Sequence, residues 1–150
     1  MWYRILVLLL FVPIAAFAWT GTCVRVVDGD DLVVLQSGKE KRIRLFGVDA
    51  PELGQPYGME AKKELEGLVL GKKVNIYSTK KDRYGRTLGW VTREGVEING
   101  ELVLRGSAWW YVKYAREEDG LQTAQEIAQS TKSGLWGLEK PIAPWVWRRR

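Results

Sequence analysis

Histidine is absent from this 150-residue chain, and cysteine occurs once, at Cys23. The lack of histidine excludes Ser-His-Asp catalysis, Cys-His catalysis and histidine-assisted cleavage of phosphodiesters, and one cysteine cannot make an ordinary zinc site. Cys23 stands in a strand-like pattern of threonine and valine, so we expect it to be a small buried hydrophobic side chain. Any enzyme in this sequence must therefore use carboxylates, arginine, lysine, tyrosine or a hard metal ion.

A long uninterrupted apolar run is also missing. Residues 1–4 carry one positive charge, residues 5–11 are apolar, Pro13 follows, and Ala16-Phe17-Ala18 has the small-x-small pattern of a cleavage site. This order predicts a secretory signal over residues 1–18, and it disfavours the alternative of a membrane anchor because Pro13 interrupts a run already short for a bilayer. We expect cleavage near Ala18 and a secreted or periplasmic protein.

The remaining composition is that of one globular domain. Hydrophobic residues make up 46% and charged residues 27% of the chain, and the formal net charge is +5. A basic secreted protein is suited to polyanions, either nucleic acid or membrane headgroups. We assign residues 19–140 to the domain and residues 141–150 to a Trp- and Arg-rich tail. The two prolines of this tail favour an extended segment, with its tryptophans packed on the domain and its arginines in solvent.

Hydrophobic periodicity predicts strands in the first part of the domain and helices among and after them. The Asp28-Gly29 pair between apolar runs suggests a hairpin whose two turn residues have positive φ. A helix is expected to open at Pro56, a second to be capped by Asn99, and a third to follow the acidic run that starts at Glu117. The expected strands are 24–27, 32–35, 42–48, 73–77 and 87–91. This order indicates an α+β, mainly β fold built on a small closed or partly open barrel.

Three short motifs carry candidate chemistry: "DGD" at 28–30, "RLFGVDAPE" at 44–52 and "DRYGR" at 82–86. Each also has an ordinary interpretation, namely a hairpin turn, a structural Arg-carboxylate pair and a loop with surface charge. Arg44 and Asp49 are five residues apart, so a regular strand would place them on opposite faces. A bulge or strand end at Gly47 would let their side chains converge.

Taken together, the motifs offer a set of groups suited to a phosphodiester. Asp30, Asp49 and a backbone carbonyl near Ala50 are oxygen ligands for a hard cation. Arg44 and Arg86 provide planar guanidinium groups for phosphate oxygens.

Glu52 is the carboxylate left to orient or deprotonate a water molecule, and the residues do not decide between these two roles. One metal ion should suffice, because the arginine pair already supplies the positive charge of a second. A two-metal site that also uses Asp28 and Asp31 is the alternative.

The sequence resembles the staphylococcal nuclease family through "VRVVDGDDLVVL", "RIRLFGVDAPELGQPYGMEAKKEL", "DRYGRTLGWV", "INGELVLRGSAWWYVKY" and "SGLW". The resemblance implies a five-stranded OB-like barrel with three helices, and calcium-dependent hydrolysis of the 5′ P–O bond of DNA and RNA that leaves 3′-phosphates. It makes Asp30, Asp49 and the carbonyl of Ala50 the Ca²⁺ ligands, and Arg44, Glu52 and Arg86 the catalytic set. It also places Arg83, Tyr84, Tyr111 and Tyr114 where the family contacts a terminal phosphate or base.

Two positions depart from the family pattern. Asp31 and Ala50 stand where the family often has Thr, and Asp31 is expected to add negative charge near the metal. The loop over residues 53–57 is shorter than in the best-known member, which affects substrate positioning.

Two other functions fit parts of the sequence. A noncatalytic OB module would bind single strands by stacking and backbone charge, without needing three carboxylates beside two arginines. A basic cell-surface adhesion domain would use the "WVWRRR" end on acidic surfaces without a metal. The nuclease interpretation predicts a monomer that has DNA and RNA as substrates and no obligate protein partner.

Overall fold

A computed structural model describes residues 18–150 of the chain. The expected signal sequence therefore lies outside the described residues, apart from Ala18, which begins the first strand. Within residues 18–150, no helix combines the length and the apolar character needed to cross a bilayer.

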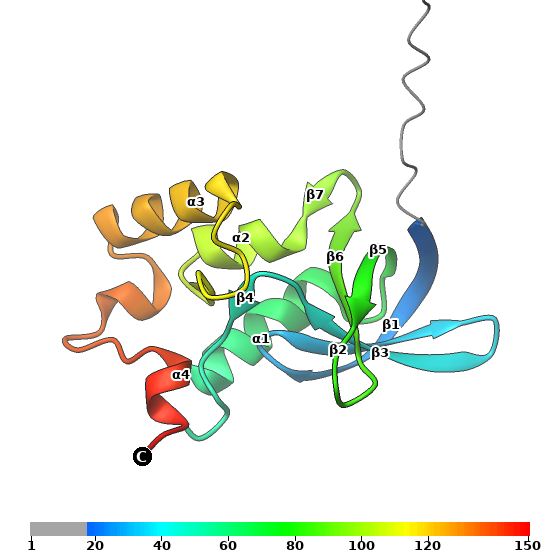
Figure 1. Ribbon diagram of the computed structural model, residues 1–150, viewed down its shortest axis with the longest axis horizontal. Helices are drawn as coiled ribbons and strands as arrows, with labels where there is room; N and C mark the ends of the chain where they lie inside the picture. Colours follow the sequence, from blue (N-terminus) through cyan, green and yellow to red (C-terminus); the bar gives the residue numbers. More distant parts are fainter. Residues whose placement is uncertain (1–17) are drawn as a thin grey trace, which may run out of the picture.

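Five strands form a closed barrel, which confirms the predicted OB-like α+β fold (Figure 1). The barrel strands are β1 (Ala18–Asp28), β2 (Asp31–Gln36), β3 (Lys39–Leu45), β5 (Lys73–Lys81) and β6 (Thr87–Arg93). They are ordered β3-β2-β1-β5-β6, and a parallel pairing of β3 with β6 closes the circle. A short strand, β7 (Val96–Glu97), extends the sheet beyond β6.

The turn between β1 and β2 differs from the expected hairpin. Positive φ angles occur at neither Asp28 nor Gly29. Gly29 is required for a different reason: a Cβ added there would lie 2.6 Å from the Cβ of Ala50 and 2.9 Å from that of Ala61. The turn thus packs directly against the segment that follows β4 (Val48–Asp49) and against the first long helix.

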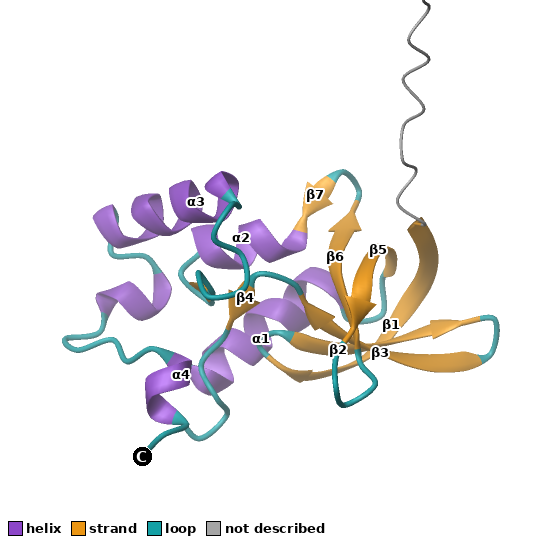
Figure 2. Cartoon of the chain, in the orientation of Figure 1, coloured by secondary structure: helices purple, strands orange, loops and turns teal. Residues whose placement is uncertain are grey.

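Helices gather at one side of the barrel (Figure 2). The described residues form α1 (Gly58–Val69), α2 (Ile98–Leu104), α3 (Asp119–Ser130), a 3₁₀ turn η1 (Gly134–Gly137) and a short α4 (Pro144–Trp147). Fully buried side chains of α1 and α2, such as Leu65 and Leu102, join Ile43 and Ile76 of the barrel in one hydrophobic core. Burial of each such side chain contributes roughly 1.5–3 kcal/mol.

Helix α1 begins two residues later than expected. The chain first makes two turns, in which Gln55 N–H donates to the Glu52 carbonyl and Gly58 N–H donates to the Gln55 carbonyl. Tyr57 then precedes the helix with a left-handed φ of 73°. These turns, rather than a first helical turn at Pro56, hold the loop that carries Glu52.

Asn99 does not cap α2, contrary to the prediction. Glu97 is the cap, and its carboxylate accepts a hydrogen bond from Gly100 N–H at 3.0 Å. Asn99 is instead buried inside the helix, where its amide accepts from Val91 N–H and donates to the carbonyls of Phe46 and Gly89. It therefore fixes α2 against β6 and against the end of β3, next to the candidate site.

The C-terminal tail is not an extended segment as predicted. Pro144 occupies the first turn of α4, where its fixed φ and missing N–H are tolerated. Trp145 packs on the domain as expected, but Arg148 does not stay in solvent, because it forms ion pairs with Asp49 and Glu52.

Candidate active site

The turn after β1 places Asp30 in a buried position beside the barrel. Only 6% of Asp30 is exposed, and its Oδ2 accepts a hydrogen bond of 2.6 Å from the backbone N–H of Ala50. The same oxygen lies 3.2 Å from Nη2 of Arg44. Close packing at Gly29 is what allows this turn to reach the segment after β4.

Gly47 brings Arg44 and Asp49 together at the end of β3. Its φ of 75° reverses the direction of the chain, after which Val48 and Asp49 form β4 and pair with Trp109–Trp110 of β8. Arg44 Nη1 donates to the carbonyls of Leu45 and Val48, and Nη2 lies 3.2 Å from Asp49 Oδ1. The guanidinium thus holds the turn and contacts both buried aspartates.

Burial gives this aspartate pair unusual acid-base properties. Desolvation raises the pKa of Asp30 from 3.8 to about 7, against the opposing effect of Arg44. Desolvation also raises the pKa of Asp49; hydrogen bonds from Arg148 lower it, and the charge of Asp30 raises it further. Two carboxylates that share one guanidinium in a buried site would be stabilised by additional positive charge.

The donor chemistry of this site fits a hard divalent cation. Asp30 and Asp49 are oxygen donors in one buried place, and Ala50, which adjoins them, is also buried. Over residues 18–150, no three or more His, Cys, Asp or Glu side chains are grouped so as to hold a metal ion. Two carboxylates would therefore leave most ligand positions to a backbone carbonyl and to water, an arrangement that Ca²⁺ accepts.

Glu52 lies at the rim of the same site. It follows β4, and its side chain is 38% exposed, whereas that of Asp49 is 2% exposed. A turn anchors the backbone: Glu52 N–H donates to the side chain of Gln55, and a Cβ at Gly58 would overlap the Glu52 carbonyl. Glu52 is thus a fixed, solvent-accessible carboxylate next to two buried ones.

Arg86 belongs to an adjacent group of charges. Its Nε donates to Asp82 at 2.7 Å and its Nη1 to Asp31 at 2.8 Å. Desolvation lowers the pKa of Arg86, but hydrogen bonds and charge attraction from Asp31 and Asp82 together raise it above its ordinary value. Leu88, two residues after Arg86, is the cross-strand partner of Arg44. Arg44 in β3 and Arg86 just before β6 are therefore carried by neighbouring strands, but within residues 18–150 Arg86 makes no hydrogen bond to Asp30, Asp49 or Glu52.

Asp31, which the sequence predicts to add negative charge near the metal, is paired with two arginines in the structure. Its buried carboxylate accepts hydrogen bonds from Arg42 and Arg86. Asp31 thereby links β2, β3 and the start of β6.

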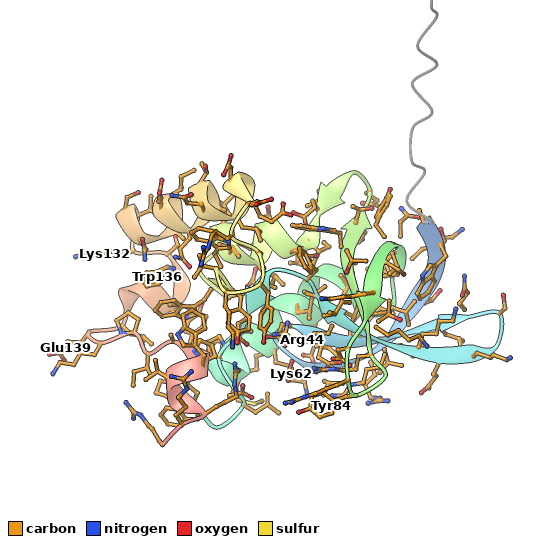
Figure 3. The ribbon with its side chains drawn as sticks, in the orientation of Figure 1. Arg44, Lys62, Tyr84, Lys132, Trp136 and Glu139 are labelled. Carbon is orange, nitrogen blue, oxygen red and sulfur yellow. The ribbon has the colours of Figure 1, made fainter. Side chains whose placement is uncertain are left out.

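The loop before β6 presents Arg83 and Tyr84 to solvent. Tyr84 is 68% exposed, and its hydroxyl lies 2.7 Å from Nη2 of Arg83. The guanidinium groups of Arg83 and Arg86 lie over its ring at 4.8 and 5.5 Å from the centroid. Figure 3 shows Tyr84 at the end of this loop and Arg44 farther inside the molecule.

Tyr111 and Tyr114 form a second aromatic group, after β8. Their rings meet edge to face, with centroids 4.9 Å apart, and Tyr114 is 60% exposed. Tyr111 also stacks on Trp145 of α4, with centroids 5.2 Å apart and an interplanar angle of 1°. The four residues predicted to contact substrate therefore lie in two separate segments.

Arg148 is the site residue that the sequence did not reveal. Nη2 lies 2.8 Å from Asp49 Oδ2, and Nη1 lies 3.1 Å from Asp49 Oδ1 and 2.7 Å from Glu52 Oε1. These bonds raise its pKa, although desolvation lowers it. Arg148 stands in a run of three arginines at the end of the chain, and no local pattern distinguishes it from its neighbours.

Comparison with known proteins points in the same direction as the geometry. The family described as "Staphylococcal nuclease homologue" matches residues 42–137. A protein of Escherichia coli O157:H7 named "Uncharacterized endonuclease" is 41% identical over 99% of this chain and 97% of its own length.

Two further relatives extend this similarity. One from Haemophilus influenzae, also named "Uncharacterized endonuclease", is 44% identical over 86% of this chain and 74% of its own length. The "Micrococcal nuclease" of Shigella flexneri is 35% identical over 93% of this chain and 87% of its own length. A closed five-stranded barrel and these matches together show that the chain belongs to the staphylococcal nuclease family.

Proposed function

We propose that this protein is a calcium-dependent nuclease that hydrolyses phosphodiester bonds of DNA and RNA without sequence preference. It cleaves the 5′ P–O bond and leaves 3′-phosphates. The observation that carries this proposal is the buried pair of Asp30 and Asp49, each of which has a carboxylate oxygen 3.2 Å from Nη2 of Arg44. Isolated buried carboxylates are costly, so a pair of them beside an arginine favours a site built for a cation and a phosphate.

In this proposal Asp30, Asp49 and the carbonyl of Ala50 hold the metal. A bound Ca²⁺ would act as a Lewis acid on a phosphate oxygen. Arg44 also keeps the turn at Gly47 closed, through the bonds of its Nη1 to two carbonyls.

Arg44 and Arg86 stabilise the negative charge that develops on the phosphate oxygens during attack by water. Arg86 is suited to this role because Asp31 and Asp82 fix its orientation, while its Nη2 makes no hydrogen bond to another side chain or backbone group within residues 18–150. Glu52 is the exposed carboxylate that remains for the attacking water.

Two aromatic groups are suited to holding the substrate. Arg83 beside Tyr84 offers positive charge and a hydroxyl to a terminal phosphate. Tyr111 and Tyr114 offer ring faces to a base, a mode of binding that tolerates every sequence. This mode of binding needs no helix that recognises bases in a groove of the nucleic acid, which agrees with a nuclease that lacks sequence preference.

The test is hydrolysis of labelled single-stranded DNA and RNA by the purified protein in Ca²⁺, in Mg²⁺ and in excess chelator. We expect hydrolysis with Ca²⁺, 3′-phosphate products, and Ca²⁺ affinity on the order of 10⁻⁴ to 10⁻³ M. Asp49→Asn should weaken Ca²⁺ binding, whereas Asp119→Asn, on the exposed start of α3, should leave it unchanged.

Other outcomes would replace the proposal. Full hydrolysis in chelator would contradict the metal site, and hydrolysis with Mg²⁺ but not with Ca²⁺ would favour two metal ions. Strand binding without hydrolysis in any metal would support a noncatalytic OB module.

A secreted or periplasmic location, expected from residues 1–18, would be tested by cell fractionation.

A further inference from the structure

The C-terminal tail lies across the candidate active site. Gln55, in the loop that carries Glu52, donates a hydrogen bond from Nε2 to the carbonyl of Ile142 at 2.5 Å. Helix α4 then runs beside this loop (Figure 1). The tail is thereby fixed to the segment that supplies one of the proposed catalytic carboxylates.

Trp145 anchors α4 on aromatic residues in and just after β8 (Trp109–Trp110), the strand that pairs with β4. Its ring is parallel to that of Tyr111, with centroids 5.2 Å apart, and meets Trp109 edge to face at 5.5 Å. A parallel stack on a tyrosine is also how a nucleobase binds an aromatic side chain. Trp145 therefore occupies one face of a residue proposed to hold the substrate.

Arg148, three residues farther along, contacts one proposed metal ligand, Asp49, and the proposed catalytic carboxylate, Glu52. Its guanidinium bonds both oxygens of Asp49, at 3.1 and 2.8 Å, and also Glu52 Oε1, at 2.7 Å. Arg44 already contacts Asp49 Oδ1, so both oxygens of this carboxylate have a cationic donor. A two-bond fork of this kind adds both energy and geometric specificity to an arginine–carboxylate pair.

Charge and position together make this tail a competitor of the metal. A guanidinium and a divalent cation repel each other, and both would need the same oxygens of Asp49. The tail also engages Oε1 of Glu52, the carboxylate proposed to act on the attacking water. Because Trp145 covers Tyr111 at the same time, one short segment mimics both the cation and a base of the substrate complex.

We propose that residues 144–148 form an autoinhibitory plug, in which Arg148 replaces the cation and Trp145 replaces a nucleobase. This inference rests on the proposed function of the same site. Binding of Ca²⁺ requires that Arg148 leave Asp49, and stacking of a base on the covered face of Tyr111 requires that Trp145 move. The tail therefore lowers the apparent affinity of the docked protein for both ligands.

The direct test measures Ca²⁺ binding, not hydrolysis. Isothermal titration of the full chain with Ca²⁺ should show about tenfold tighter binding for Arg148→Ala, as expected if about nine-tenths of the wild-type protein is plugged. Arg150→Ala is the matched control, because Arg150 lies over Trp147 and contacts neither carboxylate. It should bind Ca²⁺ as the wild type does.

A second variant separates the two halves of the plug. Trp145→Ala leaves Arg148 in the chain but removes its anchor, so Ca²⁺ should again bind more tightly. A fluorescent single-stranded oligonucleotide, titrated in chelator, should also bind more tightly to Trp145→Ala than to the wild type. Hydrogen exchange of the amides of residues 145–148 in the wild type should accelerate when Ca²⁺ and the oligonucleotide are added together.

Hydrolysis then distinguishes a plug from a third catalytic arginine. The plug predicts that Arg148→Ala is faster than the wild type at limiting Ca²⁺ and equal to it at saturating Ca²⁺. Weaker Ca²⁺ binding or a lower kcat at saturation would overturn the plug and make Arg148 part of the catalytic machinery. Unchanged Ca²⁺ affinity in both variants, in a protein that hydrolyses DNA, would overturn the plug alone. Failure of every variant to bind Ca²⁺ or cleave would overturn the proposed function.

Discussion

The carboxylate of Asp31 lies 2.8 Å from Nη1 of Arg86, and it also accepts a hydrogen bond of 2.9 Å from Nε of Arg42. Asp31 is 1% exposed, and the side chain of Arg86 is 23% exposed, so this bond is largely shielded from water, whereas the side chain of Arg42 is 51% exposed. Asp82 holds Nε of Arg86 from the other side. Arg86 is therefore oriented before any substrate binds, and ordering of its long side chain does not have to accompany the reaction.

Replacement of Asp31 should destabilise the fold. Asp31→Asn removes the charge that two arginines share, and we expect a loss of about 2 kcal/mol in the free energy of unfolding. Urea titration measures this loss. Glu40→Gln is the matched control, since Glu40 and Arg25 form an exposed pair at 3.7 Å, and its effect should stay below about 0.5 kcal/mol. Equal effects of the two substitutions would contradict a structural role for Asp31.

Lysine should not replace either proposed catalytic arginine. Arg44→Lys and Arg86→Lys keep the charge but lose the planar fork, so each should reduce kcat by roughly 10² to 10³. Affinity for single strands, measured in chelator, should change little. Arg25→Lys, on an exposed part of β1, should leave both quantities unchanged. Equal losses of affinity and turnover would instead mean that these arginines only hold the nucleic-acid backbone.

Asp30 should make the metal-free protein less stable as pH rises. Its pKa is about 7 in the folded state and about 3.8 when the group is solvated, because burial disfavours the charged form. Between these values the folded state keeps a proton that the unfolded state has lost, so this group's contribution to the free energy of unfolding decreases from pH 4 to pH 7.

Urea titrations of wild type and Asp30→Asn in chelator, at pH 5 and pH 7.5, measure this contribution. The stability of the wild type relative to Asp30→Asn should fall between the two pH values. Asp82→Asn is the control: burial raises the pKa of Asp82, but bonds from Arg86 and from backbone N–H groups lower it overall, below 3.8. Asp82 therefore stays ionised over this range. A rising or flat difference for Asp30 would contradict the predicted direction.

Gly29 should tolerate no side chain. A Cβ there would meet the Cβ atoms of Ala50 and Ala61 at distances too short for normal contact, so Gly29→Ala should lower stability by about 1–3 kcal/mol and displace Asp30. Gly67→Ala is the control, because Gly67 lies within α1 and a Cβ added there would meet no atom within 4 Å. It should raise stability by about 0.5–1 kcal/mol. Thermal unfolding and Ca²⁺ titration measure both effects.

Local patterns were sufficient to predict much of the fold and the convergence at Gly47. Alternating apolar residues mark the barrel strands, and a glycine in the middle of "RLFGVDAPE" was the one place where Arg44 and Asp49 could turn toward each other. The spacing of Asp30 after β1 likewise placed it at a strand end. These features depend on residues close in the sequence, where steric preferences act directly.

Contacts between distant segments were not predictable in the same way. Asn99 follows a strand and looks like a helix cap, but its buried amide instead bonds three backbone groups: one of Phe46, just after β3, and those of Gly89 and Val91 in β6. Arg148 pairs with Asp49 from 99 positions away. Nothing in the letters "RRR" indicates which arginine meets a buried carboxylate, because that depends on how α4 docks.

The parallel pairing of β3 with β6 has a consequence for the order in which the protein is assembled. Asp30, Arg44, Asp49 and Glu52 all precede residue 53, whereas closure of the barrel joins Ile43 to Thr87, and β1 must also pair with β5. Long loops have to close before these pairings yield any stabilisation, which places folding on the millisecond-to-second timescale typical of nonlocal β structure. A nascent chain that ends before Lys73 contains the four charged residues but neither of the strands that enclose them.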